Sequence, residues 1–299
     1  MVFRNYLNYT VVAKQSLFLG LLRRLWLLAM TQLIIFATPL FGYGYPERII
    51  SLGAAVTEEL YLLGAGEHIA GNTIYCNRPE EAKKKEKVGT VININLEKIV
   101  SLKPDLVFAT SLTNRQQVQK LKELKINVVE MPAERNFENI CVNFLKVAES
   151  IGKYPEAEKL VNEIKAKVNS IQAKTRGLPK PKVMVQIGAN PLFVATQEYF
   201  IHDFIRMAGG INIAKDALTG QYSREEVLKQ NPDIILIATM GMTGEQEKIA
   251  WKKYSSINAV KNGRIYIIDS DKFCSVTPVS FVEALQEVIK ILHPECKYD

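Results

Sequence analysis

Histidine and tryptophan are scarce in this chain, and the short motifs of the common enzymes are missing. Its 299 residues include three histidines, His68, His202 and His293, and two tryptophans. The histidines are widely separated and lack the spacing of a zinc site. The sequence contains no GxSxG nucleophile motif, no GxxxxGKS/T phosphate-binding loop and no HExxH zinc motif. We therefore expect a protein that is not an enzyme and that carries no resident metal or cofactor.

The cysteines are few and form no CxxC pair. They are Cys76, Cys141, Cys274 and Cys296. Neither a zinc ribbon nor a thioredoxin-type redox centre is therefore indicated. In an oxidising compartment four cysteines allow three pairings if all are bridged. Cys141 lies in an apolar helical pattern, where a buried free thiol is expected, and the sequence leaves the pairing of the others open.

Acidic residues are absent from residues 1–44, which hold four basic ones. The rest of the chain has 34 basic and 31 acidic residues, so the N-terminus supplies more than half of the net charge of +7. Nucleic-acid binding needs a clustered basic face, which this distribution does not provide. We therefore expect no nucleic-acid partner.

The N-terminus has the pattern of a secretory signal peptide. Arg23 and Arg24 precede the apolar run LWLLAMTQLIIFATPLF, and two glycines stand just before Tyr45. A basic flank, an apolar core and small residues at the exit predict cleavage near Tyr45. No cysteine precedes Cys76, so a lipid anchor is not expected and the mature protein should be soluble in the periplasm. An uncleaved membrane anchor is the alternative, because the apolar run approaches spanning length.

One stretch of the sequence occurs twice. Residues 96–110 read LEKIVSLKPDLVFAT, and residues 224–239 read REEVLKQNPDIILIAT, 128 positions later. Each copy has a glutamate at its second position, a short amphipathic helical pattern, a Pro-Asp pair and an apolar run of strand length. A repeat of this size indicates duplicated architecture.

Strand-like apolar runs alternate with helical patterns on both sides of residues 137–176, which carry two helical stretches with only Pro155 as a strong interruption. From Ala157 to Ile171 the apolar residues recur at helical spacing. We predict two Rossmann-like α/β lobes with mostly parallel sheets, joined by one long backbone helix, with a ligand cleft between the lobes. The predicted parts are a signal peptide at 1–44, a first lobe at 45–154, the linking helix at 155–177 and a second lobe at 178–299.

The glutamates of the repeat allow two interpretations. Glu97 follows an Asn95 cap, and Glu225 lies in a predicted capping box that begins at Ser223. Acids at helix N-termini are stabilised by the helix dipole, by about 0.3–1 kcal/mol. Alternatively, arginines of a two-fold symmetric partner could bind the two matching carboxylates through charge-assisted hydrogen bonds. The spacing alone does not separate these interpretations.

The chain from about Arg48 to Pro294 resembles the helical-backbone substrate-binding proteins of ABC importers, and most of all the members that bind cobalamin. The stretches that carry the resemblance are RIISLGAAVTEELYLLGAG, NLEKIVSLKPDLVFA, QIGANPLFVATQEYFIHDFIRMAGGINIAKDA and QYSREEVL. The resemblance implies a free monomer that holds its ligand between the lobes and delivers it to a dimeric permease in the inner membrane. It also implies that Glu97 and Glu225 dock on permease arginines.

The ligand contacts are expected in loops that face the cleft. Tyr75 and Phe193 match a cleft tyrosine and a cleft phenylalanine of the cobalamin-binding members, whereas their cleft tryptophans fall here on Val91, Thr110 and Thr219, and a cleft arginine falls near Ser275. The predicted pocket is thus less aromatic and differently charged. Other aromatic residues near the cleft loops either contact ligand or pack in the core: Tyr199, Phe200, Tyr222 and Phe273. Cys76 and Cys274, predicted on loops of opposite lobes, could bond to each other, contact a metal of the ligand or stay free.

A corrinoid, cobalamin or cobinamide-like and carrying cobalt, is therefore the predicted ligand. The alternative in the same class is a ferric siderophore or haem, for which Tyr75 would be the first candidate axial ligand. An enzyme or sensor on a similar frame is disfavoured by the missing catalytic motifs. A membrane-tethered scaffold would require the N-terminal apolar run to be retained.

Overall fold

The computed structural model describes residues 45–238 and 244–295. The predicted signal peptide at 1–44 and Cys296 lie outside these residues. Among the helices within them, none combines the length and apolar character that crossing a membrane requires.

The first lobe is built on a five-stranded sheet in which every pairing is parallel. Its strand order is β3-β2-β1-β4-β5. The strands are β1 (Ile49–Ser51), β2 (Ile69–Asn72), β3 (Glu86–Lys87), β4 (Leu106–Ala109) and β5 (Val128–Glu130). The helical segments are α2 (Ala54–Leu62), η1 (Gly66–His68), η2 (Glu80–Lys84), α3 (Leu96–Ser101) and α4 (Arg115–Glu123). Every residue of β1 and β4 is buried, as expected for a sheet covered on both faces.

The second lobe is built on another five-stranded sheet, ordered β10-β9-β6-β7, with β8 paired to β6. All pairings are parallel except β6 with β7. The strands are β6 (Lys182–Gly188), β7 (Phe193–Val194), β8 (Ile211–Asn212), β9 (Ile234–Ile237) and β10 (Ile265–Ile267). The helices are α7 (Ile201–Met207), α8 (Arg224–Gln230), α9 (Gly244–Lys252) and α10 (Asn258–Lys261). The predicted fold class of two mostly parallel α/β lobes is confirmed.

The repeat in the sequence is the same structural piece in each lobe, namely α3 followed by β4 and α8 followed by β9. The aspartate of each Pro-Asp pair performs the same task in both copies. Asp105 Oδ2 accepts a hydrogen bond from the backbone N–H of Glu47 at 2.7 Å, and Asp233 Oδ2 accepts one from that of Lys182 at 2.8 Å. Each carboxylate therefore ties the turn to the start of the neighbouring strand, β1 or β6, which explains why the Pro-Asp pair occurs twice.

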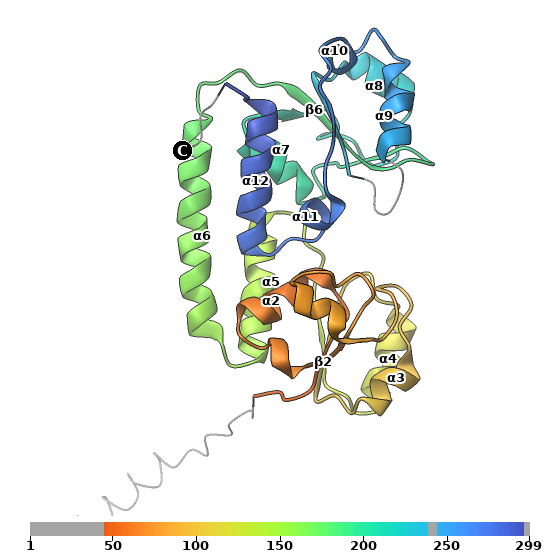
Figure 1. Ribbon diagram of the computed structural model, residues 1–299, viewed down its shortest axis with the longest axis vertical. Helices are drawn as coiled ribbons and strands as arrows, with labels where there is room; N and C mark the ends of the chain where they lie inside the picture. The colour runs from red at the N-terminus through yellow and green to blue at the C-terminus, as the bar shows by residue number, and fades with distance from the viewer. Residues whose placement is uncertain (1–44, 239–243, 296–299) are drawn as a thin grey trace, which may run out of the picture. The chain divides into compact units, whose positions relative to one another are not determined.

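Four helices pack together in a layer, and the first two lead along the chain from the first sheet to the second (Figure 1). It contains α5 (Phe137–Ser150), α6 (Tyr154–Lys174), α11 (Ser270–Cys274) and α12 (Pro278–Leu292). Pro155 lies in the first turn of α6, where proline is tolerated, so it begins this helix and does not interrupt one. The 21 residues of α6 occupy most of the predicted linking segment at 155–177. The exact lobe boundaries stay a prediction.

Aromatic rings hold this layer to the second lobe. Phe204 of α7 stacks on Phe281 of α12 with 4.4 Å between ring centroids, and Phe281 also contacts Phe137 of α5 at 4.5 Å. Phe273 of α11 meets Phe204 edge-on at 5.6 Å. Such pairs contribute about 0.5–1.5 kcal/mol each beyond their burial. Four segments that are distant in sequence are thereby packed into one core.

Candidate functional site

Tyr75 lies in the loop that follows β2, at the carboxyl end of a parallel strand. In open α/β sheets ligands bind outside these strand ends. The Tyr75 side chain is 51% exposed, which is unusual for a residue with a large apolar ring. It is therefore placed where a ligand could contact it.

Exposed aliphatic side chains accompany Tyr75 on the neighbouring loops of the first lobe. They are Ile74, Ile92 and Leu112, at 49%, 67% and 65% exposure. The loops are held together by hydrogen bonds: the backbone N–H of Ile74 donates to the carbonyl of Gly89, and the Gln117 side chain bonds both backbone groups of Ile94. Ile92 and Leu112 stand within two positions of Val91 and Thr110, where the cobalamin-binding members have tryptophans. This edge is aliphatic where those members are aromatic.

Two of the sequence-predicted ligand contacts are inside the protein. Cys76 is fully buried, and its Sγ accepts a hydrogen bond from the Thr57 hydroxyl at 3.1 Å and lies 3.3 Å from the Thr73 hydroxyl. Phe273 is 1% exposed and belongs to the aromatic core of α7, α11 and α12. Neither side chain can reach a ligand in this conformation.

The remaining predicted contacts are partly exposed and lie on three different segments. Phe193 lies in β7, opposite Gly188 of β6. Tyr222 lines a pocket beside α8 in the second lobe. Cys274 ends α11. The backbone N–H of Tyr222 donates to the Leu192 carbonyl at 3.0 Å, so Phe193 and Tyr222 lie on adjoining segments.

The cysteines within the described ranges, Cys76, Cys141 and Cys274, are free thiols. A disulfide between Cys76 and Cys274 is therefore not formed. Burial raises the pKa of Cys274 to about 11, with a further contribution from Asp271, and raises that of Cys141 to about 12. Both are neutral thiols near pH 7 and hence weak metal ligands. No group of three acids, thiols or imidazoles in the described part of the chain is placed to hold a metal ion.

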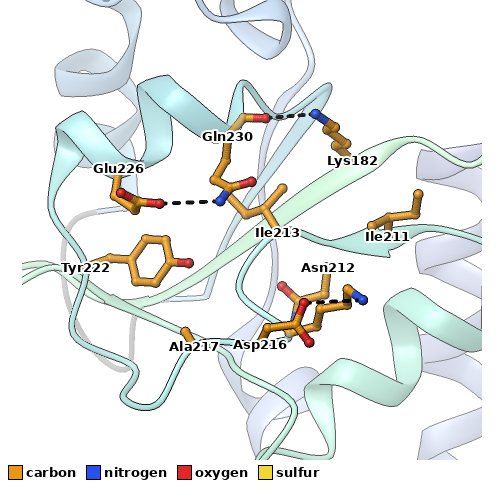
Figure 2. Close-up of a pocket in the computed structure, with 10 residues that line it drawn as sticks. Lys182, Ile211, Asn212, Ile213, Asp216, Ala217, Tyr222, Glu226 and Gln230 are labelled. Carbon is orange, nitrogen blue, oxygen red and sulfur yellow. Dashed lines mark hydrogen bonds and ion pairs between the residues drawn. The ribbon is translucent and has the colours of Figure 1, made fainter.

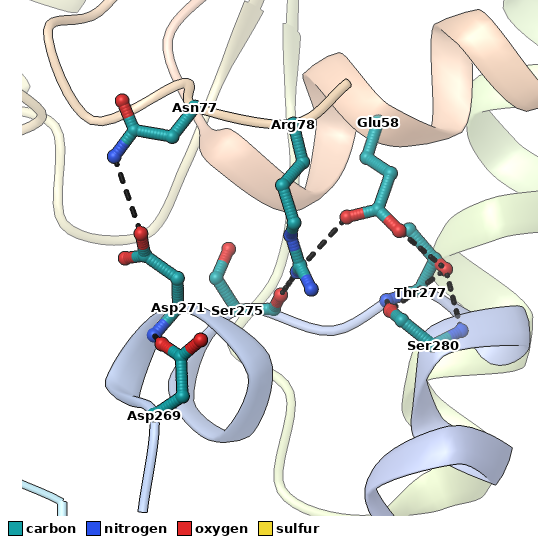
Figure 3. Close-up of polar contacts among 8 residues, drawn as sticks. All are labelled: Glu58, Asn77, Arg78, Asp269, Asp271, Ser275, Thr277 and Ser280. Atoms are coloured by element: carbon teal, nitrogen blue, oxygen red, sulfur yellow. Dashed lines mark hydrogen bonds and ion pairs between the residues drawn. The ribbon is translucent and has the colours of Figure 1, made fainter. Parts of the chain in front are cut away.

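Arg78 forms a contact between the lobes that the sequence did not predict (Figure 3). It lies in the loop after β2, and its Nη2 donates to the Ser275 carbonyl at 2.6 Å and lies 2.9 Å from Glu58 Oε2. Asn77 donates to Asp271 at 3.2 Å from the same loop. We call these contacts the Arg78 bridge. Because Ser275 is where a cleft arginine of the cobalamin-binding members falls, this chain brings a guanidinium to that position from the opposite lobe.

Glu58 contacts both Arg78 and Thr277, the residue that caps α12 in the helical layer. Burial raises the pKa of its carboxyl, while the Arg78 guanidinium opposes that shift. The Thr277 hydroxyl, 3.5 Å from Glu58 Oε1, also caps α12 by accepting from the backbone N–H of Ser280. The carboxylate is thus held between the loop of Arg78 and the start of α12. No spacing rule would connect Arg78 with Ser275, which is 197 residues away.

Arg78→Ala is expected to lower the free energy of unfolding by about 1–3 kcal/mol, because the largely buried Glu58 carboxylate would lose its cation. Urea unfolding followed by circular dichroism measures the change. Lys83→Ala is the matched control, since Lys83 forms an exposed ion pair with Glu80 that should contribute less than about 1 kcal/mol. Equal losses in the two variants would show that the Arg78 bridge does not stabilise the fold.

Glu97 and Glu225 occupy equivalent places in the two lobes, in the first turns of α3 and α8. Both side chains are exposed, and neither forms an ion pair with any residue that the structure describes. The backbone N–H of Glu225 and the Ser223 hydroxyl lower the pKa of the Glu225 carboxyl, so it is ionised at neutral pH.

The predicted helix caps are formed, with one correction. Asn95 accepts a hydrogen bond from the backbone N–H of Lys98, and Ser223 accepts one from that of Glu226. The reciprocal half of the predicted capping box is absent within α8, because the Glu226 carboxylate accepts from the Gln230 side chain instead. The hydrogen bond to Gln230 turns Glu226 along the helix and away from Ser223.

The chain has the sequence and the fold of a family of transport proteins. The model of the periplasmic binding protein family matches residues 49–272. The chain belongs to this family. It is 31% identical to an uncharacterized ABC transporter substrate-binding lipoprotein of Bacillus subtilis, with 84% of this chain and 81% of that protein covered. It is 33% identical to the vitamin B12-binding protein of Salmonella typhimurium, with 72% and 80% covered.

Solved structures agree with the fold. The periplasmic haem-binding protein of Roseiflexus sp. RS-1 superposes with a TM-score of 0.75 at 23% identity, covering 83% of this chain and 98% of that one. The protein is therefore a substrate-binding protein of an ABC importer and not an enzyme, and it acts outside the cytoplasm by binding a small ligand and a membrane permease.

Proposed function

We propose that this periplasmic binding protein captures a corrinoid, cobalamin or a cobinamide-like molecule, between its two lobes and delivers it to a dimeric permease of the inner membrane. The observation that carries the proposal is its 33% identity to a vitamin B12-binding protein over 72% of the chain. The exposed ring of Tyr75, at the carboxyl ends of the first sheet, supports it.

The proposed contacts follow from exposure. Tyr75 and the aliphatic edge of Ile74, Ile92 and Leu112 would cover the apolar parts of the ligand. Phe193 and Cys274 are partly exposed and stay in the proposed site. Cys76 and Phe273 are buried and would pack behind the site without contacting the ligand. Tyr222 lines the pocket beside α8 instead. Arg78 supplies a cation close to Ser275.

Haem or a ferric siderophore is the alternative cargo. An exposed tyrosine can serve as the axial oxygen ligand of a haem iron, and Tyr75 is accessible for that role. The structural similarity to the haem-binding protein of Roseiflexus supports this alternative. For a corrinoid, by contrast, Tyr75 would provide ring contacts without a metal–oxygen bond.

Titration with cobalamin, cobinamide, haem and a ferric siderophore, followed by absorbance and calorimetry, tests the proposal. We expect saturable one-to-one binding of a corrinoid and no binding of the others. Tyr75→Phe keeps the ring and removes the oxygen, so it should change corrinoid affinity less than about 3-fold but abolish the spectrum of a tyrosine-ligated haem. Binding of haem alone would favour the alternative, and binding of none would contradict both.

The periplasmic location is part of the proposal, with a cleavable signal at residues 1–44. Edman sequencing of the exported protein should begin near Tyr45. An N-terminus at Met1 in a membrane fraction would instead indicate the retained anchor.

A further inference from the structure

A pocket of about 370 Å³ lies beside α8 in the second lobe (Figure 2). Its volume is at the lower end of the range typical of binding pockets. Tyr222 and Ile213 give it an apolar side, and Glu226 and Gln230 line it from α8. The other lining residues are Lys182, Ile211, Asn212, Lys215, Asp216 and Ala217.

The corresponding residues of the first lobe are packed differently. The repeat relates Tyr222, Glu226 and Gln230 to Ile94, Lys98 and Leu102, each 128 positions earlier. Ile94 is 4% exposed, and Leu102 packs against the same core cluster. The Lys98 ammonium lies 2.6 Å from Glu86 of β3 and so connects α3 to the edge of the sheet. The second lobe has an acid where the first has this lysine, so the two copies of the repeat differ in charge at this position.

Two carboxylates, Glu226 and Asp216, and two ammonium groups, Lys182 and Lys215, line the pocket. Lys215 pairs with Asp216 at 3.3 Å, and the Lys182 ammonium donates to the Gln230 carbonyl at 3.2 Å. Glu226 has no ion-pair partner among the described residues, and only the neutral Gln230 amide bonds it. Burial raises the pKa of the Tyr222 hydroxyl, and the carboxylates of Glu226 and Asp216 raise it further.

The pocket adjoins the proposed docking surface. Glu226 follows the docking glutamate Glu225 directly, so one carboxylate faces solvent and the next lines the pocket. Ala217 lines the pocket, and the side chain of the next residue, Leu218, is fully exposed at 101%. Leu218 is therefore exposed beside a pocket that carries both carboxylate and ammonium groups.

We propose that this pocket receives a cationic side chain of the permease, with Glu226 as its carboxylate partner, the Tyr222 ring as its apolar wall and Leu218 as a contact at the rim. The proposal rests on the permease docking that the resemblance to ABC-importer binding proteins implies for Glu225. An arginine fits this chemistry best, because a planar guanidinium can bond a carboxylate with two N–H groups while stacking on an aromatic ring. The second lobe would then hold the permease by two successive acids, and the first lobe by Glu97 alone.

Photocrosslinking in intact cells identifies the partner. With benzoylphenylalanine in place of Leu218, we expect a crosslink to a multispanning permease subunit, mapped by mass spectrometry to a segment that contains arginine or lysine. A crosslink to a soluble protein, or none to any permease, would overturn the proposal.

The permease complex found in this way is then purified into nanodiscs, and its affinity for variants of this protein is measured. Glu226→Gln should weaken binding about 10-fold or more, because a desolvated charge pair is lost. Glu226→Lys, which installs the residue that the first lobe has at the equivalent position, should weaken it further. Glu163→Gln, an exposed acid on α6, is the matched control and should leave the affinity unchanged.

Glu225→Ala separates the two proposals. If Glu225→Ala weakens binding but both Glu226 variants bind normally with a native circular dichroism spectrum, the pocket has no role in docking. If Glu225→Ala also binds normally, the docking assignment itself fails. Saturable binding of free arginine that does not compete with the permease would assign the pocket to a small cation and would also overturn the proposal.

Discussion

Replacing Glu97 and Glu225 together by alanine is expected to abolish uptake of the ligand while leaving its affinity for the binding protein unchanged. Each carboxylate is exposed, in the first turn of a helix that the repeat places equivalently in the two lobes. A permease with two-fold symmetry would engage both with the same residues. Losing a charge-assisted contact at an interface costs about 2 kcal/mol or more, so the double variant should bind the permease about 1,000-fold more weakly.

Uptake into cells is measured alongside calorimetry on the purified protein. The matched control is Glu158→Ala with Glu163→Ala, which removes two exposed acids from α6 and makes the same change in net charge. We expect normal uptake in the control. If the two glutamates merely complement helix dipoles, the double variant would lose only a little stability and transport normally. That result would contradict docking.

The second prediction with a large effect concerns the stability of the protein at different pH values. It depends on Glu59 and Glu134, two acids of the first lobe whose pKa values are raised by burial. Glu59 of α2 is 1% exposed, and neither of its carboxylate oxygens has a hydrogen-bond partner in the described structure. Burial raises its pKa well above the usual range, and the nearby Glu134 and Glu58 raise it further. Burial also raises the pKa of Glu134 to about 7, against an opposing hydrogen bond from the Asn143 side chain.

These pKa shifts determine whether the free energy of unfolding rises or falls as the pH increases. In the folded protein Glu134 keeps its proton up to about pH 7, whereas in the unfolded chain it releases the proton near its ordinary pKa of 4.5. Unfolding between these values therefore releases a proton, and the free energy of unfolding falls as the pH rises through this window. At about 1.4 kcal/mol per pKa unit, the loss by pH 8 is at most about 3 kcal/mol from Glu134. Glu59 acts in the same direction.

Glu134→Gln should remove this dependence, because the amide is neutral at every pH and its oxygen can still accept from Asn143. We expect the variant to be more stable than the parent protein at pH 8, by up to about 3 kcal/mol, and to show a flatter profile of stability between pH 4.5 and 7. Urea unfolding at several pH values provides the measurement, with Glu163→Gln as the exposed control. Parallel profiles for Glu134→Gln and the parent protein would refute the assignment.

Long apolar and periodic segments were predicted well from the sequence. The strands β1, β4 and β9 are buried along their whole length, and a run of apolar residues is sufficient to indicate such strands. The helix α6 followed from apolar spacing in the same way. The two-residue strands β3, β7 and β8 were not predicted, because elements so short depend on pairing with a neighbour and not on their own sequence.

The candidate site was predicted less completely. Cys76 and Phe273 were expected on cleft loops because those loops follow strands, but their side chains turn inward to Thr57 and to Phe204. Which way a loop side chain points depends on packing that local pattern does not encode. Arg78 was missed for a related reason, since its partners lie on other segments and its own neighbourhood contains no motif.

By itself the sequence determined the duplicated α/β architecture, the long connecting helix and the matched glutamates, because hydrophobic period and capping chemistry are local properties of the chain. Only the tertiary structure decided that Cys76, Cys141 and Cys274 are free thiols, that Arg78 contacts Ser275 and that a pocket lies beside α8. Those outcomes depend on which side chains meet from distant parts of the chain, as Arg78 meets Ser275 at a separation of 197 residues. Such residues come together only through the close packing of the folded protein.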